Sequence, residues 1–196
     1  MSVFSKIFKR NSKPVENTFS TVQIPQIAGK FEKVSYNQYK KDVLKLFPNS
    51  EESEIQKSYD EIIIPTRATA GSAGYDIHTS TSFVLNAGEA ITIPTGLRCK
   101  ITEGWFLMLA PRSGLGFKWY TRLANTVGVV DEDYYNADNE GHIMLKLRRE
   151  SDLGDQRQML VNSGDAVAQA IFLPYGIVEG DNATAIRHGG FGSTGK

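Results

Sequence analysis

Residues 90–109 read AITIPTGLRCKITEGWFLML, and this stretch decides the fold class. Its apolar side chains recur at every second position, at residues 91 and 93, then 97, 99 and 101, then 105, 107 and 109. Residues 94–96 and 102–104 separate the three runs with Pro-Thr-Gly and Thr-Glu-Gly, which are typical of tight turns. Because successive side chains of a strand point to opposite faces of a sheet, this period of two predicts half-buried β-strands.

The same pattern extends outward from this stretch. Alternation returns over residues 143–147, and further turn signals stand at residues 86–88, 162–165 and 174–176, with no long helical pattern between them. An all-β sandwich or jelly roll follows. A chain of 196 residues is long enough for one well-buried domain with a small appendage, so we expect a single core.

The N-terminal part of the chain differs in texture from the rest, because residues 1–57 are polar, rich in Lys and poor in Gly. Ser35 is a candidate cap for a helix through KKDVLKLF, and Ser50 for a second helix through EESEIQKSY. We therefore expect an N-terminal extension over residues 1–57 that is partly helical or disordered, a β-domain over residues 58–186, and a short C-terminal arm. Deletion of the extension is expected to leave the activity of the β-domain intact.

Composition excludes several classes of function. The 22 basic and 22 acidic residues balance, so no global field draws the chain to nucleic acid, and no apolar run reaches the length of a membrane span. The basic segment MSVFSKIFKRNSK at the start of the sequence is compatible with a membrane-surface helix, but a solvated tail is the better interpretation. The segment lacks the apolar region of a secretory signal. With Cys99 as the only cysteine, no internal disulfide forms, and we expect a cytoplasmic protein that binds neither membrane nor nucleic acid.

Five segments combine glycine with polar residues where a plain β-domain needs only turns. They are AGSAGYDI (70–77), APRSGLGFK (110–118), NTVGVVDEDYYNADNEGHI (125–143), GDAVAQAIF (164–172) and RHGGFGSTGK (187–196). In the second segment, a cation, a hydroxyl and an unhindered amide follow one another at Arg112, Ser113 and Gly114. That order suits phosphate oxygens, although an ordinary turn with a surface Arg is the alternative.

The third and fifth segments also admit two interpretations each. Asp131 directly follows the apolar run 127–130, so its carboxylate is placed to act as a general base, or it serves only as a turn residue or helix cap. Residues 190–196 spell GxxxxGK, but the chain ends where a P-loop needs Ser or Thr and a helix, so that motif is rejected. A flexible arm over residues 187–196 that closes on a nucleotide with Phe191 is the more natural interpretation.

Taken in order, the five segments resemble the five motifs of the trimeric dUTPase family, over roughly residues 60–196. The resemblance implies a β-jelly roll of the β-clip type that forms a homotrimer, with each active site drawing on three subunits. It also implies hydrolysis of dUTP to dUMP and pyrophosphate, with Mg²⁺ as cofactor. Mg²⁺ keeps several waters and takes phosphate oxygens readily, so few protein ligands are needed.

Roles follow from the resemblance residue by residue. Asp131 would activate the attacking water, and Tyr134 would pack under the deoxyribose and exclude a 2′-hydroxyl. Asn125 would hydrogen-bond uracil, and Asp76 would lie near the metal-bound waters. The residues that contact phosphates or the base would be Arg112, Ser113, Gly114, Gln169, Arg187, Phe191, Gly192, Ser193 and Thr194.

The sequence departs from the family pattern at three places. Ala166 stands where the family usually has Arg, and only four residue steps separate Arg187 from Phe191 where many members have five. The third segment is longer than the common form, so the hairpin that reads the base would have a larger tip, with Asp138 to Glu140 as solvated turn residues. His188 has no family role.

Two alternatives compete with dUTP hydrolysis. A dCTP deaminase resembles the family in fold but lacks the Gly-rich arm, and zinc deaminases are excluded because they need paired cysteines. A nucleotide-binding regulatory module of the same fold is the alternative from another class, and the set of Asp131, Arg112, Tyr134 and Phe191 argues against it.

Overall fold

The computed structural model describes residues 26–151 and 157–185, together with residues 187 and 189. Helices are few and short: α1 (Tyr36–Leu46), α2 (Glu52–Asp60), α3 (Ser113–Trp119) and the 3-10 helix η2 (Glu132–Asn136). The strands are β1 (Gly29–Lys33), β2 (Tyr75–His78), β3 (Phe83–Leu85), β4 (Ala90–Pro94), β5 (Leu97–Ile101), β6 (Trp105–Pro111), β7 (Thr121–Leu123), β8 (Gly128–Val130), β9 (Met144–Arg149), β10 (Met159–Val161) and β11 (Ala166–Pro174).

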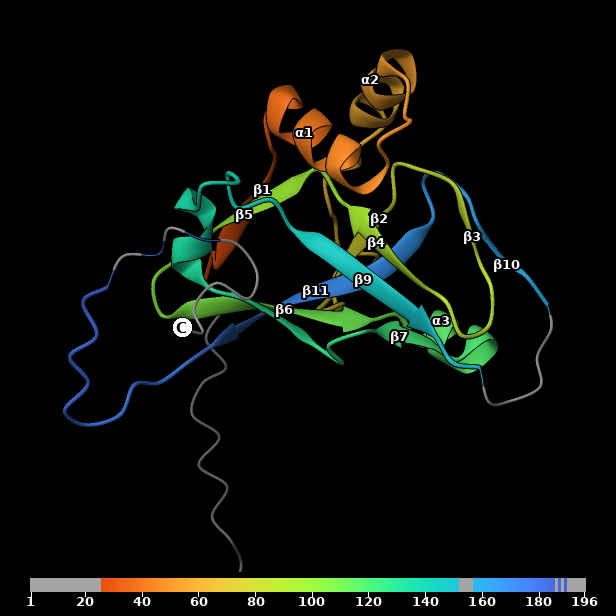
Figure 1. Ribbon diagram of the computed structural model, residues 1–196. Helices are drawn as coiled ribbons and strands as arrows, with labels where there is room; N and C mark the ends of the chain where they lie inside the picture. The colour runs from red at the N-terminus through yellow and green to blue at the C-terminus, as the bar shows by residue number, and fades with distance from the viewer. Residues whose placement is uncertain (1–25, 152–156, 186, 188, 190–196) are drawn as a thin grey trace, which may run out of the picture.

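Antiparallel pairs build all of the sheets. The largest has the order β2-β11-β6-β8, a second has the order β4-β9-β7, and β1-β5 and β10-β3 form two-stranded sheets. The strands predicted from residues 90–109 are present as β4, β5 and β6, and Gly96 and Gly104 take positive φ angles of 70° and 81° at the turns between them. The prediction of an all-β jelly roll is confirmed, with the helices α1 and α2 at one end of the β-structure (Figure 1).

The two helices of the N-terminal region form where the polar segments predicted them. Ser35 caps α1 as expected, because its Oγ accepts a hydrogen bond from the Gln38 amide. The predicted cap of α2 is wrong: Glu51, not Ser50, occupies that position, and its side chain forms a reciprocal capping box with Glu54. A carboxylate takes this place readily because the positive end of the helix dipole lies there.

Residues 26–57 share the hydrophobic core of the β-domain. Strand β1 pairs with β5 along its whole length, from Gly29 opposite Ile101 to Lys33 opposite Leu97. Tyr39 of α1 is fully buried, and the apolar residues that join it in the core from this region are Phe31, Val34, Val43 and Ile55. One core is present, as the chain length predicted, so the boundary expected after residue 57 does not separate two cores.

Two segments differ locally from a simple interpretation. The second glycine-rich segment, for which an ordinary turn was the alternative to a phosphate site, contains the short helix α3, which begins at Ser113 directly after β6. The third segment does not form a β-hairpin, since β8 pairs with β6 whereas β9 pairs with β4 and β7. Residues 131–143 therefore cross from one sheet to another, through η2 and a series of turns.

Candidate active site

The register of the largest sheet brings three of the five segments together. Gln169 of β11 lies opposite Asp76 of β2 on one side and opposite Ala110 of β6 on the other. Since Arg112 and Ser113 follow β6, the side chains of the first, second and fourth segments meet at one edge. A cavity of about 390 Å³ opens there, lined by Ser72, Gly74, Asp76, Arg112, Ser113 and Gln169 among others.

The geometry of this phosphate cleft, as we call the cavity, is set by short polar contacts. Arg112 Nε lies 3.3 Å from Asp76 Oδ1, and Arg112 Nη1 donates to the carbonyl of Ala166 at 3.4 Å. Gln169 donates to the Pro111 carbonyl at 3.2 Å. A Cβ at Gly74 would lie 2.7 Å from Gln169 Oε1, so the glycine is needed for the amide to lie there.

A second cavity, of about 650 Å³, contains the residues expected to bind the nucleoside. Asn125, Gly128, Tyr134 and Asn139 line it, and Gly189 reaches it from the C-terminal segment. Asn125 is exposed in the turn between β7 and β8, whereas Tyr134 is only 2% exposed. Burial raises the pKa of Tyr134, so its hydroxyl stays protonated and donates to the carbonyl of His142 at 2.8 Å. We call this the nucleoside cavity.

Asp131 lies at the end of β8, as predicted, and its side chain is 47% exposed. Arg187 pairs with both Asp131 and Asp133, at 2.9 Å from its Nε to Asp133 Oδ1, and its guanidinium lies 5.7 Å from the centre of the Tyr134 ring. Asp131, Asp133 and Arg187 line a third cavity, which also includes Phe106, Val129 and Tyr175. A water beside Asp131 would therefore be accessible from solvent.

The structure places the predicted site residues in different cavities of one chain. Asp76, Arg112, Ser113 and Gln169 line the phosphate cleft, with Gly114 in open space beside it. Asn125 and Tyr134 line the nucleoside cavity, and Asp131 and Arg187 line the third. Phe191, Gly192, Ser193, Thr194 and His188 lie outside the described residues. Within the described part of the chain, no group of three or more His, Cys, Asp or Glu side chains is placed to hold a metal ion.

Several residues of the nucleoside cavity were not predicted from the sequence. Asp42, Lys45 and Leu46 of α1 line it, although they stand about 80 residues before the third segment. Glu140 was expected to be a solvated turn residue, but its carboxylate accepts hydrogen bonds from the backbone amide and hydroxyl of Ser35. No pattern in the sequence marks these residues, because an acid or lysine in an amphipathic helix is ordinary.

Comparison with known proteins gives the family of the chain. The dUTPase family model matches residues 60–195. The deoxyuridine 5′-triphosphate nucleotidohydrolase of Lactococcus lactis is 40% identical over 137 residues, which cover 68% of this chain and 89% of that protein. The chain belongs to the dUTPase family.

Solved structures agree with this assignment. The crystal structure of the dUTPase from Streptococcus mutans has a TM-score of 0.57 and 29% identity, and the match covers 77% of this chain and 99% of that chain. A dUTPase from phage phi11 of S. aureus, described with a structural Mg(II) ion, has a TM-score of 0.52 at 21% identity over 64% of this chain and 92% of that chain. The second likeness concerns the fold alone. The family match begins at residue 60, so α1 and nearly all of α2 lie before it.

No helix among the described residues has both the length and the apolar character needed to cross a bilayer.

Proposed function

We propose that this chain hydrolyses dUTP to dUMP and pyrophosphate by attack of a water, activated by Asp131, on the α-phosphate. The observation that carries the proposal is the sheet register, which gathers Asp76, Arg112, Ser113 and Gln169 around one cleft. A cation, a hydroxyl and an amide donor that line one space suit the oxygens of a polyphosphate. Family membership gives the substrate that such a cleft takes.

Each side chain has a role that its surroundings support. Arg112, held by Asp76 and the Ala166 carbonyl, binds phosphate oxygens together with Ser113 and the amide of Gly114. Gln169 presents its amide at the same edge. The Tyr134 ring packs under the deoxyribose, and Asn125 with nearby backbone groups of the same cavity binds uracil. A site built to pair with uracil rejects other bases because their groups would leave buried partners unpaired.

Magnesium fits this cleft as an ion bound mainly through phosphates and water. When bound, it neutralises charge on the triphosphate and polarises the phosphorus centre. Asp76 is the carboxylate beside the phosphate-binding residues, and its partly exposed side chain is placed to accept hydrogen bonds from metal-bound water. An ion that retains several waters needs few ligands from the protein.

Assembly into a homotrimer is part of the proposal. Asp131 and Tyr134 line cavities other than the phosphate cleft of their own chain, so a complete site needs a second subunit to bring them to the phosphates. The C-terminal arm of a further subunit would close the site. Phe191 would stack on uracil, while Gly192, Ser193, Thr194 and Arg187 would reach the outer phosphates.

The test of the function replaces the proposed base. Asp131→Asn keeps the shape of the side chain and removes its basicity, so pyrophosphate release from dUTP should fall by about 10³-fold, while a non-hydrolysable imido analogue of dUTP still binds. Asp133→Asn is the matched control, because Asp133 also pairs with Arg187, and it should retain most of the activity. An Asp131→Asn protein with a tenth of wild-type turnover would exclude the role.

The same assay addresses the alternatives. A nucleotide-binding regulatory module would bind the imido analogue of dUTP but release no pyrophosphate from dUTP. A deaminase of the same fold would release ammonia from dCTP. Pyrophosphate release from dUTP that depends on Mg²⁺ and exceeds release from each other dNTP would support the proposal over both.

A further inference from the structure

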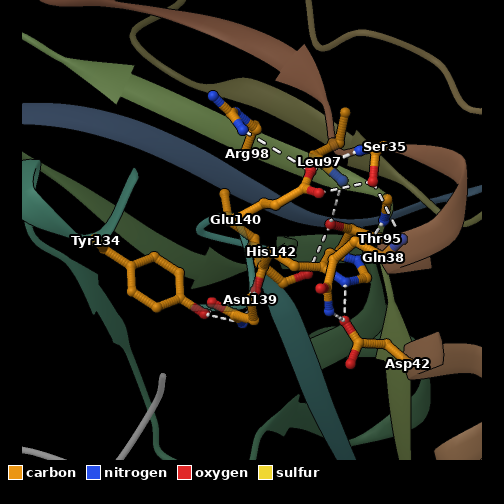
Figure 2. A network of polar contacts seen from close by, with 12 residues as sticks. Ser35, Gln38, Asp42, Thr95, Leu97, Arg98, Tyr134, Asn139, Glu140 and His142 are labelled. Atoms are coloured by element: carbon orange, nitrogen blue, oxygen red, sulfur yellow. Dashed lines mark hydrogen bonds and ion pairs between the residues drawn. The ribbon is translucent and has the colours of Figure 1, made fainter. Parts of the chain in front are cut away.

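The loop Asp131–Ile143 carries Tyr134 but has no strand to hold its shape. It closes on itself through side chains: the Tyr134 hydroxyl donates to the His142 carbonyl at 2.8 Å and accepts from Asn139 Nδ2 at 2.9 Å (Figure 2). Gly141, with a φ of 69°, turns the chain tightly against the backbone of Tyr134. The position of the Tyr134 ring therefore depends on where His142 lies.

The imidazole of His142 is fully buried, and its hydrogen bonds fix its tautomer. The backbone N–H of Gly96 donates to Nε2 at 2.8 Å, so Nε2 carries no proton in this arrangement. The proton then lies on Nδ1, which donates to Asp42 Oδ2 at 2.6 Å. Asp42 belongs to α1, 100 residues away in the sequence, and is the acceptor that this buried N–H requires.

Asp42 is itself held in place from within α1. Gln38, one helical turn earlier, donates from Nε2 to the same Oδ2 atom at 2.7 Å. The Gln38 amide is in turn the group that Ser35 caps. Burial alone would raise the pKa of Asp42, but the hydrogen bonds from His142 and Gln38 outweigh it and hold the pKa below its ordinary value.

Two further contacts join the same two segments. Both oxygens of Glu140 accept from Ser35, at 2.7 Å from the amide and 2.6 Å from the hydroxyl (Figure 2). Tyr135 donates to Glu32 at 2.6 Å, and its ring lies under the guanidinium of Arg98 at 3.6 Å. Residues 32–42 thus hold the loop at three successive points.

The contact with α1 also reaches the cavity itself. Asp42, Lys45 and Leu46 line the nucleoside cavity together with Asn125 and Tyr134. These residues of α1 precede the part of the chain that the family model matches. A segment outside the matched region therefore forms a wall of the cavity that binds the substrate.

We propose that Asp42 is a positioning residue for the nucleoside: through His142 it fixes the loop that presents Tyr134, and so sets affinity for dUTP and discrimination against a 2′-hydroxyl. The inference rests on the proposed function, since it concerns the same site. Asp42 lines neither the phosphate cleft nor the cavity of Asp131. Its loss therefore changes binding more than the chemical step.

The test is steady-state kinetics of the full chain with dUTP and with UTP. Asp42→Ala leaves the buried N–H of His142 without its acceptor, so KM for dUTP should rise about tenfold while kcat stays within about twofold. The ratio of kcat/KM for UTP to that for dUTP should rise severalfold. Asp42→Asn should restore both values, because an amide oxygen at the Oδ2 position accepts from His142 and Gln38 alike.

Two further variants complete the design. Asn37→Ala, at an exposed position of the same helix, is the control that should match wild type in KM and in the UTP ratio. Gln38→Met removes one hydrogen bond to Asp42 and should raise KM less, which keeps the test open if Asp42→Ala does not fold. Melting temperatures and sedimentation identify the folded variants.

The outcomes separate the inference from the function on which it rests. Wild-type protein that releases no pyrophosphate from dUTP would overturn both. Active wild type with unchanged KM and an unchanged UTP ratio in folded Asp42→Ala or Gln38→Met would overturn the inference alone. So would an Asp42→Asn variant as impaired as Asp42→Ala, because the oxygen acceptor would then not be what matters.

Discussion

The phosphate cleft and the nucleoside cavity are built in different ways. The cleft lies at the edge of adjacent strands, where the ladder of β2, β11 and β6 places Asp76, Gln169 and Arg112 side by side. The nucleoside cavity has one wall from the loop Asp131–Ile143, which is held by side chains of residues 32–42. Backbone pairing fixes the first region, whereas in the second region side-chain contacts with residues 32–42 add to the backbone hydrogen bonds of the loop itself.

Because of this difference, the two regions should respond differently to single substitutions. A strand ladder keeps its register when one exposed side chain changes, since its hydrogen bonds are made by the backbone. A loop held by Asp42, His142 and Glu140 depends most on the partner of His142, because a fully buried polar group that loses its partner costs about 1–3 kcal/mol. Substitutions near the phosphates should therefore act locally, and changes in the N-terminal helices should act at a distance on the base and sugar.

The largest expected effect comes from removing residues 1–57. The sequence suggested that activity survives this deletion, but strand β1 and the buried Phe31, Tyr39 and Val43 would be lost with it. Each buried apolar side chain contributes about 1.5–3 kcal/mol, so we expect the truncated protein to be largely unfolded or aggregated. Circular dichroism melts and sedimentation measure this. Deletion of residues 1–25, which removes no proposed site residue, is the control, and a folded, active protein without residues 1–57 would contradict the shared core.

The two regions also differ in how far the sequence predicted them. Strands β4, β5 and β6 follow from alternation within residues 90–109, and Asp131 at the end of β8 follows from the apolar run before it. These are local features, which can be recognised from residues that are neighbours in the sequence. The contacts of Asp42 with His142 and of Ser35 with Glu140 join residues at least 100 positions apart, so nothing in either segment indicates them. The cap of α2 was misplaced by one residue because Ser50 and Glu51 are both acceptable caps.

A substitution in the phosphate cleft should lower activity without changing selectivity. Arg112→Lys keeps the charge but loses the planar fork that Asp76 and the Ala166 carbonyl orient, so kcat/KM should fall by about 10²-fold. Because both substrates carry the same triphosphate, dUTP and UTP should lose equal factors. Pyrophosphate release from each nucleotide gives the ratio, and a ratio that shifts would mean that the cleft also reads the sugar.

A substitution in the nucleoside cavity should do the reverse. Tyr134→Ala removes the ring proposed to exclude the 2′-hydroxyl, so kcat/KM for UTP relative to dUTP should rise roughly tenfold. Tyr134→Phe keeps the ring and removes the hydroxyl that contacts His142 and Asn139, so it should raise the ratio much less than Tyr134→Ala does while costing about 1 kcal/mol of stability. The pair separates the ring from its hydrogen bonds, and an unchanged ratio in Tyr134→Ala would assign the discrimination to another residue.

The smallest expected effect is a sensitivity to acid at the contact between α1 and the loop. Burial raises the pKa of Glu140, but the hydrogen bonds from Ser35 outweigh it, so the pKa lies below its ordinary value of 4.5, as that of Asp42 lies below 3.8. A carboxyl whose pKa is lowered in the folded protein binds fewer protons there than in the unfolded chain. Its contribution to stability is therefore complete above the ordinary value and is lost as the pH falls through the folded pKa. We expect the melting temperature of wild type to exceed that of the double variant Asp42→Asn, Glu140→Gln by roughly 2–4 °C at pH 6, a difference that shrinks below pH 4.

Glu89→Gln is the matched control, because the pKa of Glu89 is also lowered, by hydrogen bonds from Asn86, away from α1. If the double variant lost stability in acid as steeply as wild type while Glu89→Gln did not, these two carboxylates would not be the groups that couple the N-terminal helix to the loop.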